Sequence, residues 1–395
     1  MKLKSILAIS LCVCLTISSF VCYKKREMIH LFYKIHSHPP QWAAQQIQSD
    51  FSEFSSKITL SSIDETFRKT RNGFLVYRYR IIDGQIFRIG EEEPLRRAFT
   101  FEKMLRRIQR STSLPNVDFL ICMMDGVPEV YVPNDFWIAE NKERQAPLLA
   151  WAKKENARHI VLIPDILTTI EYSWDREIGI ISERMRSIPW EKRQNIAFWR
   201  GGTTDKGYTL ENYQTKPRFL ISCLSHEFPQ YVDAGLGRPK QEDLAELLNR
   251  SNAIKNFASI ADHLQYKYLP VLDGWMCTYP GYQWRLLSGS VPFKQESDEM
   301  QYYYPQLKPF VHYVPIKNDM SDLIEKVKWA IQHDSECKTI AQNARSFALE
   351  NLMPDDIYAY LYRVLKKYAS LQAFDVRDKL EETQNNPLWQ RIPGA

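Results

Sequence analysis

The chain has 395 residues, of which 44% are hydrophobic and 25% are charged, and its formal net charge is +5. This composition is that of a globular protein long enough for two domains, and it excludes a disordered or fibrous chain. Because the positive excess is small and both signs of charge are interspersed, it also argues against nucleic-acid binding, which calls for a dense basic patch.

The first predicted element is an uncharged apolar run over residues 5–23, with basic residues on both sides. A run of about 19 residues just suffices to span a bilayer as a helix. We therefore expect residues 1–26 to form a single-pass N-terminal membrane anchor, with a cleaved signal peptide or a buried helix as alternatives. The cysteines beyond this run are far apart, which favours reduced thiols and a globular part on the cytoplasmic side if the chain is bacterial.

Residues 27–187 are predicted to form an N-terminal α/β domain. The segment 74–89 alternates around Asp83-Gly84 and predicts a β-hairpin. An amphipathic helix over 92–111 and a buried strand over 116–124 follow. A second helix over 146–157 and a strand over 159–165 complete the alternation, which is typical of a parallel sheet.

Residues 188–376 are predicted to form a second α/β domain with a helical C-terminal part. Strands are expected over 195–202, 230–235, 266–272 and 312–316. Three helices then follow over 321–334, 335–352 and 354–372, and Pro354 before two aspartates is a well-formed helix start. Residues 377–395 are charged and are expected to form a flexible tail.

The segment "FWRGGTT" follows the first strand of the second half. In such sheets ligands bind at loops beyond the carboxyl ends of strands. Arg200 is a cationic fork suited to phosphate oxygens, and the glycines let backbone amides approach an anion. The alternative is a strand-end turn with Arg200 in a structural ion pair. The candidate binding residues here are Arg200, Gly201, Gly202, Thr203 and Thr204.

A second glycine-rich stretch, "DGWMCTYPGYQWRLLSGSVPFKQES", runs from Asp273 to Ser297. We expect a short helix from about Gly281 whose free amides, with Arg285 one turn in, suit a nucleotide diphosphate. The alternative is that Arg285 is solvated and its neighbours are core. The candidate nucleotide-sugar-binding residues here are Asp273, Gly274, Trp275, Thr278, Tyr279, Gly281, Arg285, Lys294 and Glu296.

Asp125 ends a predicted strand and precedes a glycine. A carboxylate in that place can take the proton of a hydroxyl as a general base, and the alternative is an ordinary Asp-Gly turn. The chain contains no D-x-D and no H-x-x-x-H, so we expect neither a metal nor a cofactor. The phosphate-binding and dinucleotide-binding glycine fingerprints are also absent, which disfavours an NAD-dependent oxidoreductase.

Taken together, "FWRGGTT", "YKYLPVLDGWMCTYPGYQWRLLSGSVPFKQES", "YYYPQLKPFVHYVPIKNDMSDLIEKVKWA" and "ARSFALENLMPDDIYAYLYRVLKKYA" resemble the CAP10-like glycosyltransferases. That family includes Rumi-like protein O-glucosyltransferases and bacterial lipopolysaccharide-modifying transferases. The form "PGYQWRLLSGS" looks more like the bacterial branch. The animal enzymes carry an arginine where Gly281 stands here, and Arg285 is the candidate substitute.

The resemblance implies a GT-B-like fold, in which two Rossmann-like α/β domains enclose a cleft. It implies inverting, metal-independent transfer of a glucose- or xylose-like sugar from a UDP-sugar. Asp125, with Pro128 after it, matches the family's base, and Arg200 matches its phosphate-binding arginine. The acceptor would be a hydroxyl of a lipopolysaccharide, another surface glycan or a protein. A non-catalytic sugar- or polyanion-binding protein on the same fold is the alternative.

Overall fold

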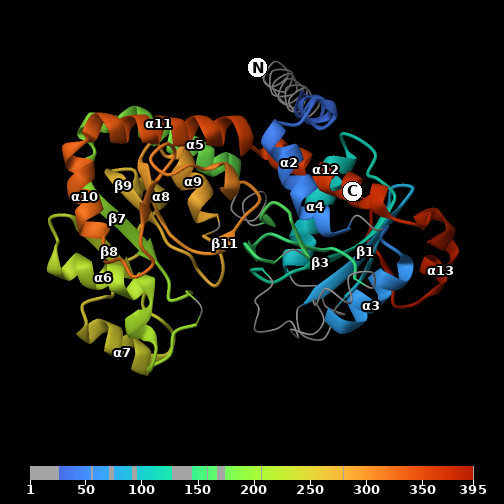
Figure 1. Cartoon of the computed structure of the whole chain (residues 1–395), viewed down its shortest axis with the longest axis horizontal. Helices are drawn as coiled ribbons and strands as arrows, with labels where there is room; N and C mark the ends of the chain where they lie inside the picture. Colours follow the sequence, from blue (N-terminus) through green and yellow to red (C-terminus); the bar gives the residue numbers. More distant parts are fainter. Residues whose placement is uncertain are drawn as a thin grey trace, which may run out of the picture.

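The computed structural model describes residues 26–54, 57–70, 75–90, 96–126, 145–157, 159–166, 174–205, 207–278 and 280–394. Two lobes lie side by side, each built around one large sheet with helices packed on it (Figure 1). The first sheet takes its strands from before residue 163 and from the C-terminal end, and the second takes all of its strands from residues 194–316.

The sheet of the first lobe is mixed, with strand order β13-β2-β1-β3-β4-β6. Strand β1 is antiparallel to both β2 and β3, whereas β3, β4 and β6 are parallel. The predicted hairpin is confirmed, and Asp83 and Gly84 form its turn with positive φ angles of 46° and 77°. The strands are β1 (Val76–Ile82), β2 (Gln85–Ile89), β3 (Val117–Cys122), β4 (Leu148–Ala150), β6 (Ile160–Leu162) and β13 (Gln390–Arg391).

The helix predicted over 146–157 is wrong. This segment forms β4 and then the two-residue strand β5 (Lys153–Lys154). All three residues of β4 are buried, so its apolar residues do not alternate with polar ones. A short apolar run of this kind cannot be assigned to helix or strand by its period alone.

The C-terminal part of the chain returns to the first lobe. Gln372 donates a hydrogen bond to the carbonyl of Asp118 in β3 (2.7 Å), and the tail ends as β13, paired with β2. The segment predicted as a flexible tail therefore forms ordered structure through residue 394. The helices of this lobe are residues 26–36, α2 (Gln41–Asp50), α3 (Leu60–Thr70), α4 (Arg96–Gln109), α12 (Pro354–Leu371) and α13 (Leu380–Asn385), with 3-10 turns Ser52–Phe54 and Val376–Lys379.

The sheet of the second lobe is parallel throughout, with strand order β12-β10-β9-β7-β8. The carboxyl ends of its strands therefore share one edge, where the predicted binding loops lie. The strands are β7 (Gln194–Gly201), β8 (Val232–Leu236), β9 (Tyr266–Val271), β10 (Val291–Gln295) and β12 (Val314–Ile316). The helices are α5 (Trp174–Ser187), α6 (Pro217–Glu227), α7 (Glu242–Arg250), α8 (Ile260–His263), α9 (Gly281–Leu287), α10 (Leu323–Gln332) and α11 (Asp334–Asn351).

A small two-stranded sheet joins the lobes. Strand β11 (Glu299–Met300) follows β10 of the second lobe and pairs antiparallel with β5 of the first. Next to it, the backbone amide of Glu155 donates to the carbonyl of Asp298 (2.8 Å). This contact places the carboxyl edge of the second sheet against the first lobe.

The expectation of a single-pass membrane anchor is not supported. Across the residues that the structure describes, no helix has both the length and the apolar character needed to cross a membrane. The apolar run over residues 5–23 lies outside those residues.

Candidate active site

The strand-end loop that carries Asp125 touches the second lobe at Gly126. This glycine has a φ of +155°, and a Cβ there would lie 2.9 Å from Met276 Cε and 3.0 Å from the carbonyl of Ala152. A side chain at this position would press on Met276 of the second lobe and on the backbone of Ala152, so the close approach favours glycine. The contact brings Asp125 beside the Trp275–Cys277 loop. Pro128 lies outside the described residues.

Arg97, in the first turn of α4, holds Asp125 in place. Its Nη2 lies 2.5 Å from Asp125 Oδ1, and its Nη1 donates to the carbonyl of Met123 (2.9 Å). No residue in the described part of the chain donates to Asp125 Oδ2, and the side chain is 29% exposed. Asp125 is thus a fixed carboxylate with one oxygen accessible to an incoming hydroxyl.

The second lobe contributes Arg218, which the sequence motifs did not single out. This residue in the first turn of α6 is only 9% exposed. It donates to the carbonyl of Gly202 (2.9 Å), to Thr204 Oγ1 (2.6 Å) and to the carbonyl of Asp273 (2.9 Å). A Cβ on Gly274 would lie 3.2 Å from its Nη2. Arg218 therefore ties together the loops that follow β7 and β9.

Arg285 is a buried cation that no described carboxylate neutralises. It is 5% exposed, and its Nη1 donates to the carbonyl of Gly281 (3.0 Å) while its Nε has no hydrogen-bond partner among the described residues. Burial, with a smaller contribution from Arg218, lowers the pKa of Arg285 to about 9. A buried charge without a counter-ion is costly, and a bound anion would remove that cost.

Gly281 leaves room for this cation, because a Cβ there would lie 2.9 Å from Arg285 Nη1. The guanidinium also stacks over the Trp284 ring at 4.2 Å. The alternative of a solvated Arg285 is therefore excluded by its burial. The helix that begins at Gly281 has only seven residues, so its N-terminus is not taken as an anion site, and the arginines are the groups that could hold an anion.

Arg200 forms a structural ion pair, which the sequence analysis gave as the alternative to phosphate binding. Its Nη2 lies 2.9 Å from Asp233 Oδ1, its side chain is 14% exposed, and its guanidinium stacks over the Phe198 ring at 4.4 Å. Lys255 shares the same Asp233 oxygen at 2.5 Å. Burial opposes the effect, but these two cations lower the pKa of Asp233 below its ordinary value. A role for Arg200 in phosphate binding remains a prediction.

Asp273 and Lys294 form the buried support of the glycine-rich loop. Asp273 Oδ1 accepts hydrogen bonds from Thr278 (3.0 Å) and Lys294 (3.1 Å), and its Oδ2 accepts one from Ser297 (2.5 Å). These bonds connect the ends of β9 and β10. Asp273 and Lys294 are thus predicted binding residues that are already paired with each other.

The remaining predicted residues lie around this edge of the sheet. Trp275 is 37% exposed and packs against Gly207, whose added Cβ would lie 3.4 Å from the ring. Glu296 is exposed at the end of β10, and Thr203 is half-buried. Gly201 abuts the Trp199 ring, where a Cβ would clash at 2.3 Å. Tyr279 lies outside the described residues.

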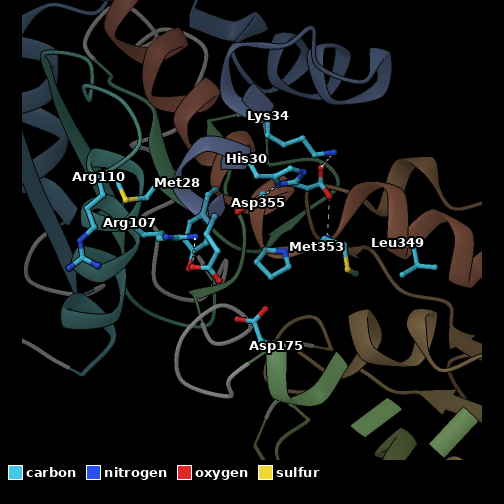
Figure 2. Close-up of a pocket in the computed structure, with 13 residues that line it drawn as sticks. Met28, His30, Lys34, Arg107, Arg110, Asp175, Leu349, Met353 and Asp355 are labelled. Carbon is cyan, nitrogen blue, oxygen red and sulfur yellow. Dashed lines mark hydrogen bonds and ion pairs between the residues drawn. The ribbon is translucent and has the colours of Figure 1, made fainter. Parts of the chain in front are cut away.

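A cavity of about 640 Å³ lies at the other end of α4 from Arg97 (Figure 2). Three of its basic side chains are paired with acids: His30 with Asp355, Lys34 with Asp356 at 2.7 Å, and Arg107 with Glu27 at 3.4 Å. We assign it no role in the active site because none of the candidate site residues lines it.

The profile of "Glycosyl transferase family 90" matches residues 37–388. The match covers most of the chain, so the chain belongs to Glycosyl transferase family 90. The family predicted from the sequence motifs is confirmed.

The chain is similar to several animal protein O-glucosyltransferases. It is 30% identical to Protein O-glucosyltransferase 3 of Rattus norvegicus, over 84% of this chain and 62% of that protein. Identity to Protein O-glucosyltransferase 2 of Danio rerio is 28%, over 85% of this chain and 64% of that protein. The chain thus spans about three-fifths of the length of these relatives. The greater likeness to the bacterial branch stays a prediction.

Two solved structures share only a distant likeness. "Glycosyltransferase from Rickettsia africae ESF-5" has a TM-score of 0.40 at 10% identity, over 63% of this chain and 69% of that one. "Anabaena Alr3699/HepE in complex with UDP-glucose" has a TM-score of 0.33 at 15% identity, over 49% of this chain and 53% of that one. At these scores the likeness carries no argument about the site.

Proposed function

We propose that the chain transfers a glucose- or xylose-like sugar from a UDP-sugar to an acceptor hydroxyl, with inversion and without a metal. The observation that carries the proposal is the buried, uncompensated Arg285 on the second lobe, near the loop that meets Asp125. The two facing α/β lobes support a GT-B-like arrangement for this enzyme. The acceptor is a hydroxyl of a protein, as the names of the relatives suggest, or of a surface glycan.

In this mechanism the accessible oxygen of Asp125 takes the proton of the acceptor hydroxyl. The acceptor oxygen attacks the anomeric carbon from the face opposite the diphosphate, and the bond from that carbon to the phosphate oxygen breaks. Arg285 lies near Arg218, and their positive charges stabilise the departing diphosphate in a largely dry site. Arg97 keeps the Asp125 carboxylate aimed by holding its other oxygen.

The protein should be tested with a panel of UDP-sugars, by calorimetric binding of UDP and by release of UDP during turnover. We expect UDP to bind and at least one UDP-hexose or UDP-pentose to be consumed, in the presence of EDTA as in its absence. Binding of sugars or polyanions without any turnover would support a non-catalytic binding protein. An activity that EDTA abolishes and manganese restores would contradict metal-independent transfer.

A further inference from the structure

Another cavity, of about 460 Å³, lies in the first lobe between the end of the helix over residues 26–36, α2 and α12. Helices α2 and α12 lie side by side on this lobe (Figure 1). None of the candidate site residues lines this cavity, so the proposed transfer reaction makes no use of it. We refer to it below as the α12 cavity.

The charge of its wall has one sign. In the part of the chain that the structure describes, the wall contains four basic side chains and no carboxylate; they are His36, Arg363, Lys366 and Lys367. The last three stand at positions i, i+3 and i+4 of α12, so they share one face of that helix and repel one another. Neither lysine lies in the last turn, where the helix dipole would favour a cation.

Arg363 is the fixed member of this group. Its Nη2 donates to the carbonyls of Lys34 (2.6 Å) and Ser37 (3.2 Å), at the end of the helix over residues 26–36. Its Nη1 and Nε have no hydrogen-bond partner among the described residues, and they are not buried. Burial of the side chain as a whole lowers the pKa of Arg363, and Asp356, which is paired with Lys34, opposes the shift. One edge of the guanidinium is therefore held by the protein, and the other is available to an anion.

The two lysines are also without partners. Neither Lys366 nor Lys367 makes an ion pair within the described part of the chain. Lys366 is exposed and Lys367 is half-buried. Because like charges on one helix face destabilise the helix, a group of three cations without an acid is explained best by an anion that binds to all three.

The remainder of the wall is mostly apolar. Ile35, Ile47 and Tyr362 are buried there, and Pro39 and Ala44 lie beside them. The volume is far larger than that of one phosphate group. An occupant that fills the cavity therefore carries an organic part, which packs against these side chains, in addition to its negative charge.

We propose that the α12 cavity binds a small phosphomonoester, whose phosphate lies between Arg363, Lys366 and Lys367 and whose organic part packs against Ile47 and Tyr362. A phosphomonoester carries close to two negative charges at neutral pH and three acceptor oxygens, which suits three cations. A carboxylate has one charge and two oxygens, so it suits them less well. The inference goes beyond the proposed function and does not rest on it.

The first test is calorimetric titration of the full chain with glucose 6-phosphate and with glycerol 3-phosphate. Inorganic phosphate is the probe without an organic part, and glucose is the probe without a charge. At least one phosphomonoester should bind about tenfold more tightly than inorganic phosphate, because its organic part is buried. Glucose that binds as tightly as glucose 6-phosphate, or phosphomonoesters that all bind more weakly than about 10 mM, would overturn the proposal.

The second test removes the two lysine charges together. Lys366→Gln/Lys367→Gln should weaken binding of the phosphomonoester by about 100-fold, because two charge-assisted contacts are lost. Lys103→Gln is the matched control, since Lys103 is an exposed lysine of α4 outside the cavity. It should bind the probe as the wild type does. Equal affinities in the wild type and the double variant would overturn the assignment.

The candidate active site must be separated from the α12 cavity, because Arg285 is itself a candidate for binding phosphates. The titration is therefore repeated in Arg285→Met, where binding of the phosphomonoester should persist. Binding that Arg285→Met abolishes and the double variant keeps would overturn the proposal. The double variant should bind UDP and consume UDP-sugars as the wild type does, so a failure at the α12 cavity leaves the proposed function standing.

Thermal unfolding distinguishes a ligand site from a structural role of the lysines. The double variant without ligand should not melt below the wild type, because the change relieves repulsion on α12. The phosphomonoester should raise the melting temperature of the wild type and not that of the double variant. A double variant that melts below the wild type, with no ligand-dependent shift in the wild type, would mean that the lysines are structural.

A phosphate carried by a lipid presents the same chemistry, so vesicles of phosphatidic acid and phosphatidylcholine are the last probe. The wild type should not sediment with them more than the double variant does. Lysine-dependent sedimentation, together with no binding of the soluble phosphomonoesters, would overturn the assignment of a small soluble ligand.

Discussion

Asp125 of the first lobe and Arg285 of the second, two charged groups of the candidate site, are held in opposite ways. In the first lobe, Asp125 is 29% exposed and already has its counter-ion in Arg97. In the second lobe, Arg285 is 5% exposed and has no carboxylate partner in the described structure. A charged group that is paired and partly solvated is stable without a ligand, whereas a buried cation without a counter-ion becomes stable only when an anion binds. Under the proposed function, this difference means that the base is preformed and that the anion site is held at a cost in stability.

The largest effect is expected from a substitution at Asp125, in the first lobe. Asp125→Asn keeps the size of the side chain and its bond to Arg97 but removes the proton acceptor. The rate of transfer should fall by about 10²–10⁴-fold, while the affinity for UDP stays unchanged because the nucleotide is held by the other lobe. Steady-state kinetics and calorimetry on the same preparation measure both. Transfer near the wild-type rate would exclude Asp125 as the base.

Next in size is the loss of the buried cation. Arg285→Met should weaken UDP binding by about 100-fold, because a charge-assisted contact with the diphosphate disappears. The same change should raise the melting temperature of the ligand-free protein, because it removes an uncompensated buried charge. A lowered melting temperature with intact UDP binding would mean that Arg285 is a structural residue.

Arg193 provides the matched control, since burial, with a smaller contribution from Arg345, also lowers its pKa, to about 10. It donates to the carbonyl of Ser288 (3.2 Å) and to Ser290 Oγ (2.5 Å) at the end of α9. Arg193→Met should therefore lower the melting temperature and leave UDP affinity unchanged. Opposite shifts in melting temperature for the two arginines would separate a binding cation from a structural one.

Much of the fold follows from local sequence pattern, and the exceptions have identifiable reasons. The hairpin of β1 and β2 and the strand–helix alternation of the second lobe are local features, and both are confirmed. The pairing of β13 with β2 joins residues about 300 positions apart, at Gln390 and Arg88, and no local pattern announces it. Strand β4 was missed because its burial on both faces removes the alternation that marks a strand.

The candidate site was predictable where it lies at strand ends. Asp125, Gly126 and the glycine-rich loops stand where parallel strands present ligand contacts. Arg218 was missed because its neighbours in space, at Gly202, Thr204 and Asp273, come from loops distant in sequence.

A further comparison of the lobes concerns acid stability. Burial lowers the pKa of His159 in the first lobe and of His263 in the second to about 3. Unfolded histidines bind protons below about pH 6.5, whereas these do not until about pH 3, so acid favours the unfolded state. Each should reduce the free energy of unfolding by about 1.4 kcal/mol per pH unit as the pH falls through that window.

The measurement is urea denaturation at pH values between 4 and 6.5. His263→Gln and His159→Gln should each reduce the slope of the free energy of unfolding against pH by about 1.4 kcal/mol per pH unit, the contribution of one histidine. His226→Gln, at an exposed position, is the control and should leave the slope unchanged. A slope that neither variant changes would mean that these histidines titrate alike in the folded and unfolded states.

The smallest effect is expected at Arg200, the cation that the sequence favoured for the phosphate. Its guanidinium is held by Asp233 and lies over Phe198, so little of it is available to a ligand in this arrangement. Arg200→Ala should weaken UDP binding by less than about tenfold, well short of Arg285→Met, and should lower the melting temperature because Asp233 loses a partner. Lys255 still pairs with Asp233, which limits that destabilisation. Calorimetry could instead show that Arg200→Ala loses as much UDP affinity as Arg285→Met. Arg200 must then leave Asp233 when the nucleotide binds, and the anion site of the second lobe forms only on ligand binding and is not preformed.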